Sequence, residues 1–224
     1  MTILGKNIKL TSIILLFLCL SLTSCFDIIQ DVTVKENGSG KFALTLNLSK
    51  SKSQIDKILT QDSIHGFNIP SIKEINSKLI RLKSELNKLQ GISNVTIHKD
   101  FENFIFKLNF DFDHINNLND AQIELAKLNA KIGQPIKYTF SPNEFSCSYS
   151  EKLLEQADNE LVKYKLSELK SADIITILRF DKTVNDCSAQ TCKISTNGKT
   201  TFNKITAAEF IQNKKNQSLK VTFK

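Results

Sequence analysis

Strand-like runs joined by short turn signals constrain the fold of this chain more than any other sequence feature. Asn37-Gly38-Ser39-Gly40, Glu102-Asn103, Pro142-Asn143 and Asn197-Gly198 each stand between two such runs. Glycine and asparagine supply the turn conformations that connect neighbouring antiparallel strands. The pattern predicts strand pairs at 28–35 with 41–49, 92–101 with 104–113, 136–141 with 144–150, and 192–196 with 199–205, and single strands at 174–180 and 219–223. Hairpins favour antiparallel pairing, so the sequence predicts an antiparallel sheet.

The hairpin at 92–113 shows the clearest pattern of core residues. If Phe101 lies opposite Phe104, one face of the hairpin is apolar and the other is polar. The apolar face carries Val95, Ile97, Phe101, Phe104, Phe106, Leu108, Phe110 and Phe112. The polar face carries Thr96, His98, Asp100, Lys107, Asn109, Asp111 and Asp113. We therefore expect the phenylalanine-rich face to form the hydrophobic core.

Helical signals alternate with the hairpins. Ser71 and Glu74 fit a capping box, and Gly91 is expected to end that helix. Its apolar positions form fewer than three heptads, which favours packing on the protein's own sheet over pairing with a partner helix. Other helices are expected at 51–59, at 119–132 with Asn119 as the N-cap, at 151–169, and after a second capping box at Thr206 and Glu209. The predicted fold class is α+β: an antiparallel sheet built from successive β-hairpins, with helices packed on one face.

The first 24 residues have the layout of an export signal. Lys6 and Lys9 precede an apolar run from Ile13 to Leu22, which is typical of a secretory signal peptide. A helix that crosses a bilayer needs roughly 20 apolar residues, and this run has about half that length. We therefore expect a cleaved signal peptide at 1–24 and one α+β domain at 25–224.

The run Leu22-Thr23-Ser24-Cys25 ends this signal. It resembles the lipobox of bacterial lipoproteins, in which an aliphatic and two small residues precede a cysteine. The resemblance implies cleavage between Ser24 and Cys25 and acylation of Cys25, for which palmitate is one expected fatty acid. It places the protein in the cell envelope, bound to a bacterial membrane, with the outer membrane preferred over the inner one. The alternative is a plain secreted protein with a cysteine after its cleavage site.

A short neck follows Cys25. Only about 3 to 5 residues precede the first expected strand, a reach of roughly 10 to 18 Å, and Phe26, Ile28 and Ile29 make this neck apolar. These residues either contact the membrane or start the first strand. An acylated cysteine followed by a strand, an Asn-Gly turn and a second strand is similar to LppM-type envelope lipoproteins. That resemblance implies an α+β ectodomain able to take a lipid, without assigning a role to any residue.

The remaining cysteines fit an oxidising compartment. Once Cys19 leaves with the signal and Cys25 is acylated, Cys147, Cys187 and Cys192 remain. Cys187 and Cys192 can close a small disulfide ring, which stabilises a fold by about 2 kcal/mol. Cys147 alternates with Phe145 and Tyr149 on one strand face, so we interpret it as a buried thiol. A zinc site is not favoured because no histidine follows Cys192.

Charge and motifs narrow the function classes. Loss of Lys6 and Lys9 lowers the formal net charge from +7 to +5, spread evenly along the chain, so a nucleic-acid partner is not expected. Asp111, Asp113 and His114 could form a metal or acid site. However, the alternation of charged with apolar residues on a solvated strand face explains the carboxylates. The sequence contains no P-loop, nucleophile elbow, zinc-protease helix or dinucleotide motif.

The favoured interpretation is therefore a lipid-anchored envelope lipoprotein that acts as a binding or structural module at the membrane surface. Its expected partners are the membrane, through Cys25, and an envelope protein. We predict no cofactor, no metal ligands and no catalytic residues, and the sequence carries no signal for an oligomeric state. Two alternatives stay open: a carrier of an apolar or lipid ligand between sheet and helices, and a hydrolase without a recognisable motif.

Overall fold

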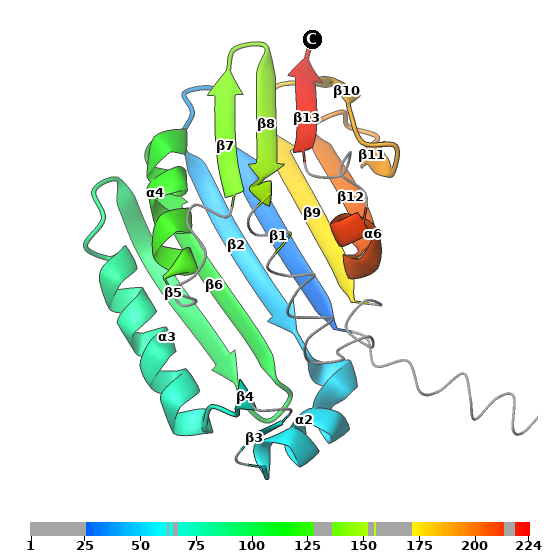
Figure 1. Ribbon diagram of the computed structural model, residues 1–224. Coiled ribbons are helices and arrows are strands. Elements are labelled where there is room, and N and C mark those ends of the chain that lie inside the picture. The colour runs from blue at the N-terminus through cyan, green and yellow to red at the C-terminus, as the bar shows by residue number, and fades with distance from the viewer. Residues whose placement is uncertain are drawn as a thin grey trace, which may run out of the picture.

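The computed structural model describes residues 26–61, 63, 64, 67–127, 136–151, 155, 172–212 and 218–224. Two sheets, four α-helices and one short hairpin make up this described part (Figure 1). The large sheet has seven strands in the order β11-β12-β9-β1-β2-β6-β5. They are β1 (Asp27–Val34), β2 (Gly40–Asn47), β5 (Ile92–Asp100), β6 (Ile105–Phe112), β9 (Asp173–Phe180), β11 (Cys192–Ile194) and β12 (Thr200–Thr206). The small sheet, ordered β10-β13-β8-β7, contains β7 (Ile136–Ser141), β8 (Glu144–Tyr149), β10 (Val184–Cys187) and β13 (Ser218–Phe223).

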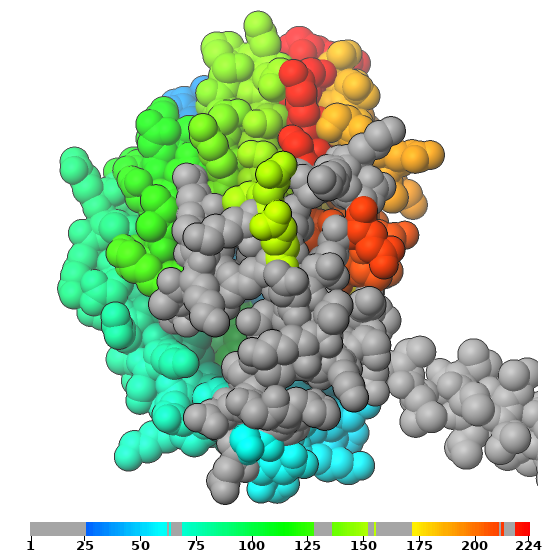
Figure 2. All heavy atoms as spheres, in the orientation of Figure 1, coloured from blue at the N-terminus to red at the C-terminus, as the bar shows by residue number. Residues whose placement is uncertain are grey.

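The helices lie around the front face and the lower end of the large sheet in Figure 1. A one-turn 3-10 helix (Ser49–Ser51) leads into α2 (Lys52–Leu59), which the hairpin of β3 (Ser63–Ile64) and β4 (Phe67–Asn68) follows. The longer helices are α3 (Ile72–Leu86) and α4 (Ile115–Ala126), and α6 (Ala207–Gln212) is a short helix after β12. Figure 2 shows α3 and α4 forming one flank of the molecule. The predicted helix at 151–169 lies outside the described residues.

The predicted α+β class is confirmed, and each predicted hairpin is present. β1 with β2, β5 with β6, β7 with β8, and β11 with β12 pair antiparallel. Gly38 and Gly198 adopt the positive φ values of +80° and +69° that these turns need. In the second hairpin, Asp100 pairs with Ile105 and Thr96 with Asn109, as the Phe101–Phe104 alignment requires. A bulge between Ser93 and Thr96 shifts the register beyond that point.

The arrangement differs from the prediction in two ways. β1 pairs with β9 in parallel, residue for residue from Asp27 with Asp173 to Val34 with Phe180. In addition, the small sheet covers the front face of the large one, whereas the sequence predicts that helices alone cover one face of the sheet. Hairpin signals report only pairings between strands adjacent in sequence, so neither a parallel pair of distant strands nor a second sheet leaves a local pattern.

The core lies between the two sheets, with α3 and α4 packed at one side. The second hairpin contributes Val95, Leu108, Phe110 and Phe112, which are at most 6% exposed. Rings from different strands meet here: Phe42 stacks on Phe110 at 4.9 Å, and Phe180 of the large sheet touches Phe145 of the small one at 5.4 Å. Burial of such side chains contributes roughly 1.5 to 3 kcal/mol each. The predicted phenylalanine-rich core is thus confirmed.

Helix α3 begins as predicted, with both hydrogen bonds of the Ser71–Glu74 capping box. It ends at Leu86, with Asn87 as C-cap, so the prediction that Gly91 ends the helix is wrong. Gly91 instead turns the chain into β5, with φ +72°. Leu82 and Leu86 are buried, whereas Ile72 is 46% exposed, so only the second half of the apolar stripe reaches the core.

The prediction that Asn119 is a helix N-cap is also wrong. Helix α4 starts earlier, at Ile115, and His114 caps it by accepting a hydrogen bond from the Asn116 backbone N–H at 3.2 Å. Asn119 lies inside the helix, where its amide binds the backbone of Tyr138 in edge strand β7. Its Nδ2 donates to the Tyr138 carbonyl at 2.9 Å, and its Oδ1 accepts from the Tyr138 N–H at 2.8 Å. One side chain thus satisfies both backbone groups of a residue at the edge of the small sheet.

We expect Asn119→Ala to lower the free energy of unfolding by about 1 to 3 kcal/mol, because the Tyr138 backbone loses both partners. Asn116→Ala is the matched control, since Asn116 is an exposed residue on the same helix. Urea unfolding followed by circular dichroism measures the difference. Equal stability of the two variants would contradict the role of Asn119.

Candidate functional site

The amino-terminal end of the large sheet is the first candidate site, because β1 starts immediately after the proposed lipidation position. Ser24 and Cys25 lie outside the described residues. Phe26 already belongs to the sheet hydrogen-bond network, since its carbonyl accepts from the Asp173 N–H at 2.9 Å. Ile28 and Ile29 are strand residues, which confirms the interpretation that the neck starts the first strand. Membrane contact is a separate question, because a strand side chain can also face a membrane.

This end of the sheet carries paired charges. Lys50, just before α2, lies with its Nζ 3.5 Å from Oδ2 of Asp27. Lys204 of β12 lies 2.8 Å from Oδ2 of Asp173. Both carboxylates are therefore neutralised next to the point where the chain enters the sheet. Exposed pairs of this kind contribute little to stability, about 0 to 1 kcal/mol.

Cys187 and Cys192 form a disulfide. Cys187 ends β10 of the small sheet, and Cys192 starts β11 of the large sheet, so the bond joins the two sheets at one side of the core. The Cys192 N–H also donates to the Ala189 carbonyl at 2.9 Å, which closes the turn between the two strands. This disulfide fixes how the chain crosses from one sheet to the other.

Of the candidate metal or acid site, the side chains of Asp111 and His114 have structural partners, and the Asp113 N–H donates to the Gly91 carbonyl at 2.9 Å. Asp111 accepts from Nδ2 of Asn94 at 2.8 Å and lies 3.6 Å from Nζ of Lys41. His114 caps α4. Within the described residues, no group of three or more histidine, cysteine or acidic side chains is placed to hold a metal ion.

A polar cluster inside the protein was not predicted. Gln30 of β1, Cys147 and Tyr149 of β8 and Thr176 of β9 lie close together between the two sheets, and Nε2 of Gln30 is buried without a hydrogen-bond partner among the described residues. Gln30 and Thr176 are register partners in the parallel pair and are about 5% exposed. The sequence signal was a polar residue at an inward strand position: Gln30 alternates with Val32, and Thr176 with Leu178.

The predicted burial of Cys147 is confirmed, and it suppresses the chemistry of this thiol. Cys147 is fully buried and has no disulfide partner. Desolvation raises its pKa from 9.0 to about 12, and it raises the pKa of Tyr149 and Tyr138 as well. The thiolate is the reactive form of cysteine, so Cys147 is inert at neutral pH and serves as core.

Three hollows are lined by described residues. One of about 110 Å³ lies between α3 and α4, bordered by Lys78, Arg81, Glu85, Glu124 and Lys127. A second of about 290 Å³ lies between the end of α3 and α4, and a third of about 370 Å³ lies beside β11, β12 and α6. All three hollows lie open to solvent, whereas a small-molecule site buries most of its ligand's surface.

Local structural contacts lower the pKa of two acidic groups in these hollows. Hydrogen bonds lower the pKa of Glu85, from Lys88, and of Glu209, from the Thr206 backbone. Glu209 and Thr206 complete the predicted second capping box. A general acid needs a raised carboxyl pKa. The pKa values of Glu85 and Glu209 are instead lowered, as structural hydrogen bonds to a carboxylate produce.

Comparisons with known proteins add a likeness of fold. No family model matches the chain, and no curated protein matches it. Among solved structures, the chain is similar to the NMR structure of the folded domain of LppM from Mycobacterium tuberculosis, with 10% sequence identity and a TM-score of 0.44. The match covers 90% of this chain and 91% of that one.

The buried thiol makes stability depend on alkaline pH. Below pH 9 the thiol of Cys147 is protonated in both the folded and the unfolded chain. Above pH 9 the unfolded thiol loses its proton, whereas the folded one keeps it up to about pH 12. The free energy of unfolding therefore falls as pH rises through this range, by up to about 1.4 kcal/mol per pH unit for each such group.

Urea unfolding between pH 8 and pH 10 measures this fall, before the unfolded tyrosines, with an ordinary pKa of 10.0, contribute strongly. Cys147→Ala is the control and should flatten the profile in this range. A wild-type profile already flat from pH 8 to pH 10 would contradict the burial of a neutral thiol.

Proposed function

We propose that the protein is a lipid-anchored lipoprotein of a bacterial cell envelope, and that its α+β body is a binding or structural module held at the membrane surface. The observation that carries the proposal is the position of β1. Its first residue, Asp27, follows Cys25 by two positions, a reach of about 7 Å at most. An acylated Cys25 would therefore leave almost no spacer between the bilayer and the large sheet.

None of the helices in the described part of the chain combines the length and the apolar character needed to cross a membrane. Two or three acyl chains give stable attachment, because each buried CH₂ contributes about 0.8 kcal/mol.

A binding or structural role is favoured over catalysis by the chemistry of the described residues. The buried thiol is held neutral, and the candidate acid group of Asp111 and His114 is used in an ion pair and a helix cap. The three hollows lie open to solvent, which does not favour the alternative of an apolar-ligand carrier. The exposed surface is therefore where we place the function.

Replacing the proposed lipidation residue tests the anchor. Cys25→Ala should abolish labelling by radioactive palmitate and block cleavage after Ser24, so that the chain keeps the mass of the precursor. Mass spectrometry of the amino-terminal peptide of the wild type should show an acylated Cys25. The control is Cys19→Ala, which changes a cysteine inside the apolar run of the signal. An unmodified Cys25 in membrane extracts, with Cys25→Ala processed normally, would overturn the proposal.

A further inference from the structure

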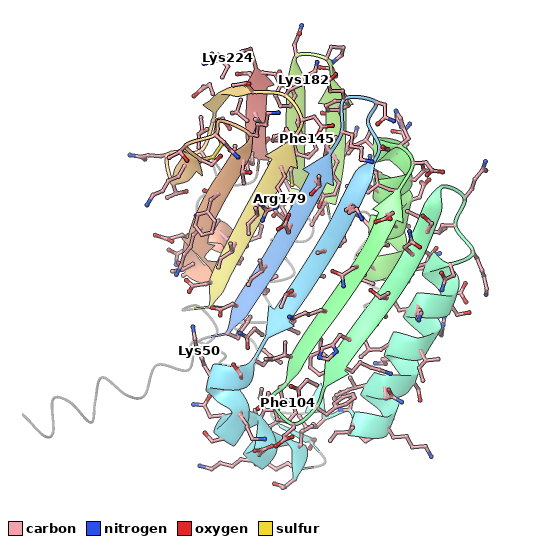
Figure 3. The ribbon with its side chains drawn as sticks, turned by 180° about the vertical axis from the view of Figure 1, so that it is seen from behind. Lys50, Phe104, Phe145, Arg179, Lys182 and Lys224 are labelled. Atoms are coloured by element: carbon pink, nitrogen blue, oxygen red, sulfur yellow. A yellow bond between two sulfur atoms is a disulfide. The ribbon has the colours of Figure 1, made fainter. Side chains whose placement is uncertain are left out.

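The outer face of the large sheet carries an apolar strip. No helix and no second sheet of the described part of the chain covers this face, which Figure 3 shows from behind. The strip consists of Ile29 on β1, Ile175 and Ile177 on β9, and Phe202 on β12. Ile29 pairs with Ile175, and Ile177 pairs with Phe202, so the four side chains are neighbours on one side of the sheet. The isoleucines are half-buried, and Phe202 is 39% exposed.

The charges next to the apolar strip are balanced. Asp31 accepts hydrogen bonds from the Arg179 guanidinium, with Nη2 2.9 Å from Oδ2, and Arg179 stands on this face in Figure 3. Asp27 and Asp173 are paired with Lys50 and Lys204. These three carboxylates thus each have a cationic partner, and Glu209, which lines the hollow beside Phe202, accepts hydrogen bonds from Thr206.

Two lysines flank the aromatic ring. Lys193 of edge strand β11 lies opposite Phe202 in the sheet register, and Lys204 lies two residues further along β12. Lys193, Phe202 and Lys204 line the open hollow of about 370 Å³ beside β11 and β12. An aromatic ring between cationic side chains is typical of surfaces that meet the boundary between phospholipid headgroups and acyl chains.

The rest of the same face is different. On β5 and β6 the outward residues are polar and exposed, among them Thr96, His98, Lys107 and Asn109. The apolar residues are thus gathered on the half of the face that contains β1, the strand that follows Cys25. Ile29 is four residues from Cys25, so the strip begins within about 14 Å of the acylated sulfur.

We propose that the apolar strip rests on the phospholipid surface of the membrane that holds the anchor, with Lys193 and Lys204 at the level of the lipid phosphates. The inference depends on the proposed lipidation of Cys25 and adds the orientation of the body: the outer face of the large sheet faces the bilayer. The small sheet and α4 then face away from the membrane.

The size of the apolar strip favours a membrane over a protein partner. A stable protein interface buries about 800 Å² on each partner, whereas one fully buried aromatic side chain supplies only about 150 to 250 Å². Four side chains that are already partly covered fall short of that area. A weak contact suffices at the membrane, because the acyl anchor keeps the local concentration of the lipid surface high.

The experiment uses the full-length lipidated protein in vesicles of phosphatidylethanolamine and phosphatidylglycerol. The chain contains no tryptophan, so Phe202→Trp introduces a single reporter at an exposed position. We expect its emission to shift to the blue and to lose about half its intensity when the lipids carry bromine, as for a side chain at the headgroup boundary. Ile80→Trp on α3, where Ile80 is 57% exposed, is the matched control and should show neither change.

A charge reversal provides a second measurement. In the Phe202→Trp background, Lys193→Glu should weaken the quenching, whereas Lys107→Glu on the polar half of the same face should leave it unchanged. Circular dichroism of each variant confirms that the fold is intact.

The outcomes separate the inference from the proposed function. Vesicle flotation measures whether the protein is anchored to the membrane. Quenching of the Trp reporter by brominated lipids measures which face of the body meets the membrane. Flotation together with an unquenched Trp reporter at position 202 would overturn the inference alone, and cross-linking of the same sample into dimers would then assign the strip to a second copy of the chain. Failure of the wild type to float would overturn the anchor and the inference together.

Discussion

The parallel pairing of β1 with β9 is the contact on which the rest of the structure depends. It joins the first strand to a strand that follows some 140 residues later, in register over eight residue pairs. Without it, the sheet would split into a four-stranded half built from β1, β2, β5 and β6 and a three-stranded half built from β9, β11 and β12. The pairing also brings Gln30 beside Thr176 under the small sheet, and Ile29 beside Ile175 on the opposite face. Both the polar cluster in the interior and the apolar strip on the surface are products of this one contact.

Three different structural contacts protect the edge strands of the two sheets. Helix α3 runs alongside the outer strand β5 (Figures 1 and 3), and Nζ of Lys99 in β5 donates to Asn76 of that helix at 2.7 Å. Asn119 of α4 satisfies the backbone of Tyr138 in β7. The disulfide between Cys187 and Cys192 ties the remaining edge strands β10 and β11 together. Exposed strand edges can pair with strands of other chains. Because these edges are protected, the face of the large sheet is the surface available for contacts with other molecules.

The interior and the surface have separate roles. Desolvation holds the Cys147 thiol neutral, whereas Nε2 of the neighbouring Gln30 is buried without a hydrogen-bond partner among the described residues, which is a cost to the core. The carboxylates next to the apolar strip are instead paired with lysine or arginine, which allows that part of the surface to approach an anionic lipid layer without repulsion. The charge balance of the outer face is consistent with the proposed contact between the apolar strip and the membrane.

The sequence by itself determined the hairpins, the Ser71–Glu74 cap, the buried Cys147 and the phenylalanine-rich face of β5 and β6, because each depends on residues close together in the chain. The alternation of side chains fixed the register at Thr96 and Asn109 but did not reveal the bulge near Asn94, which adopts a positive φ of 54°. Alternation also shows which residues share a strand face, but not what covers that face. Only the tertiary structure decided that β9 joins β1, that a second sheet covers one face, and that Asn119 binds an edge strand, because these depend on which distant segments meet.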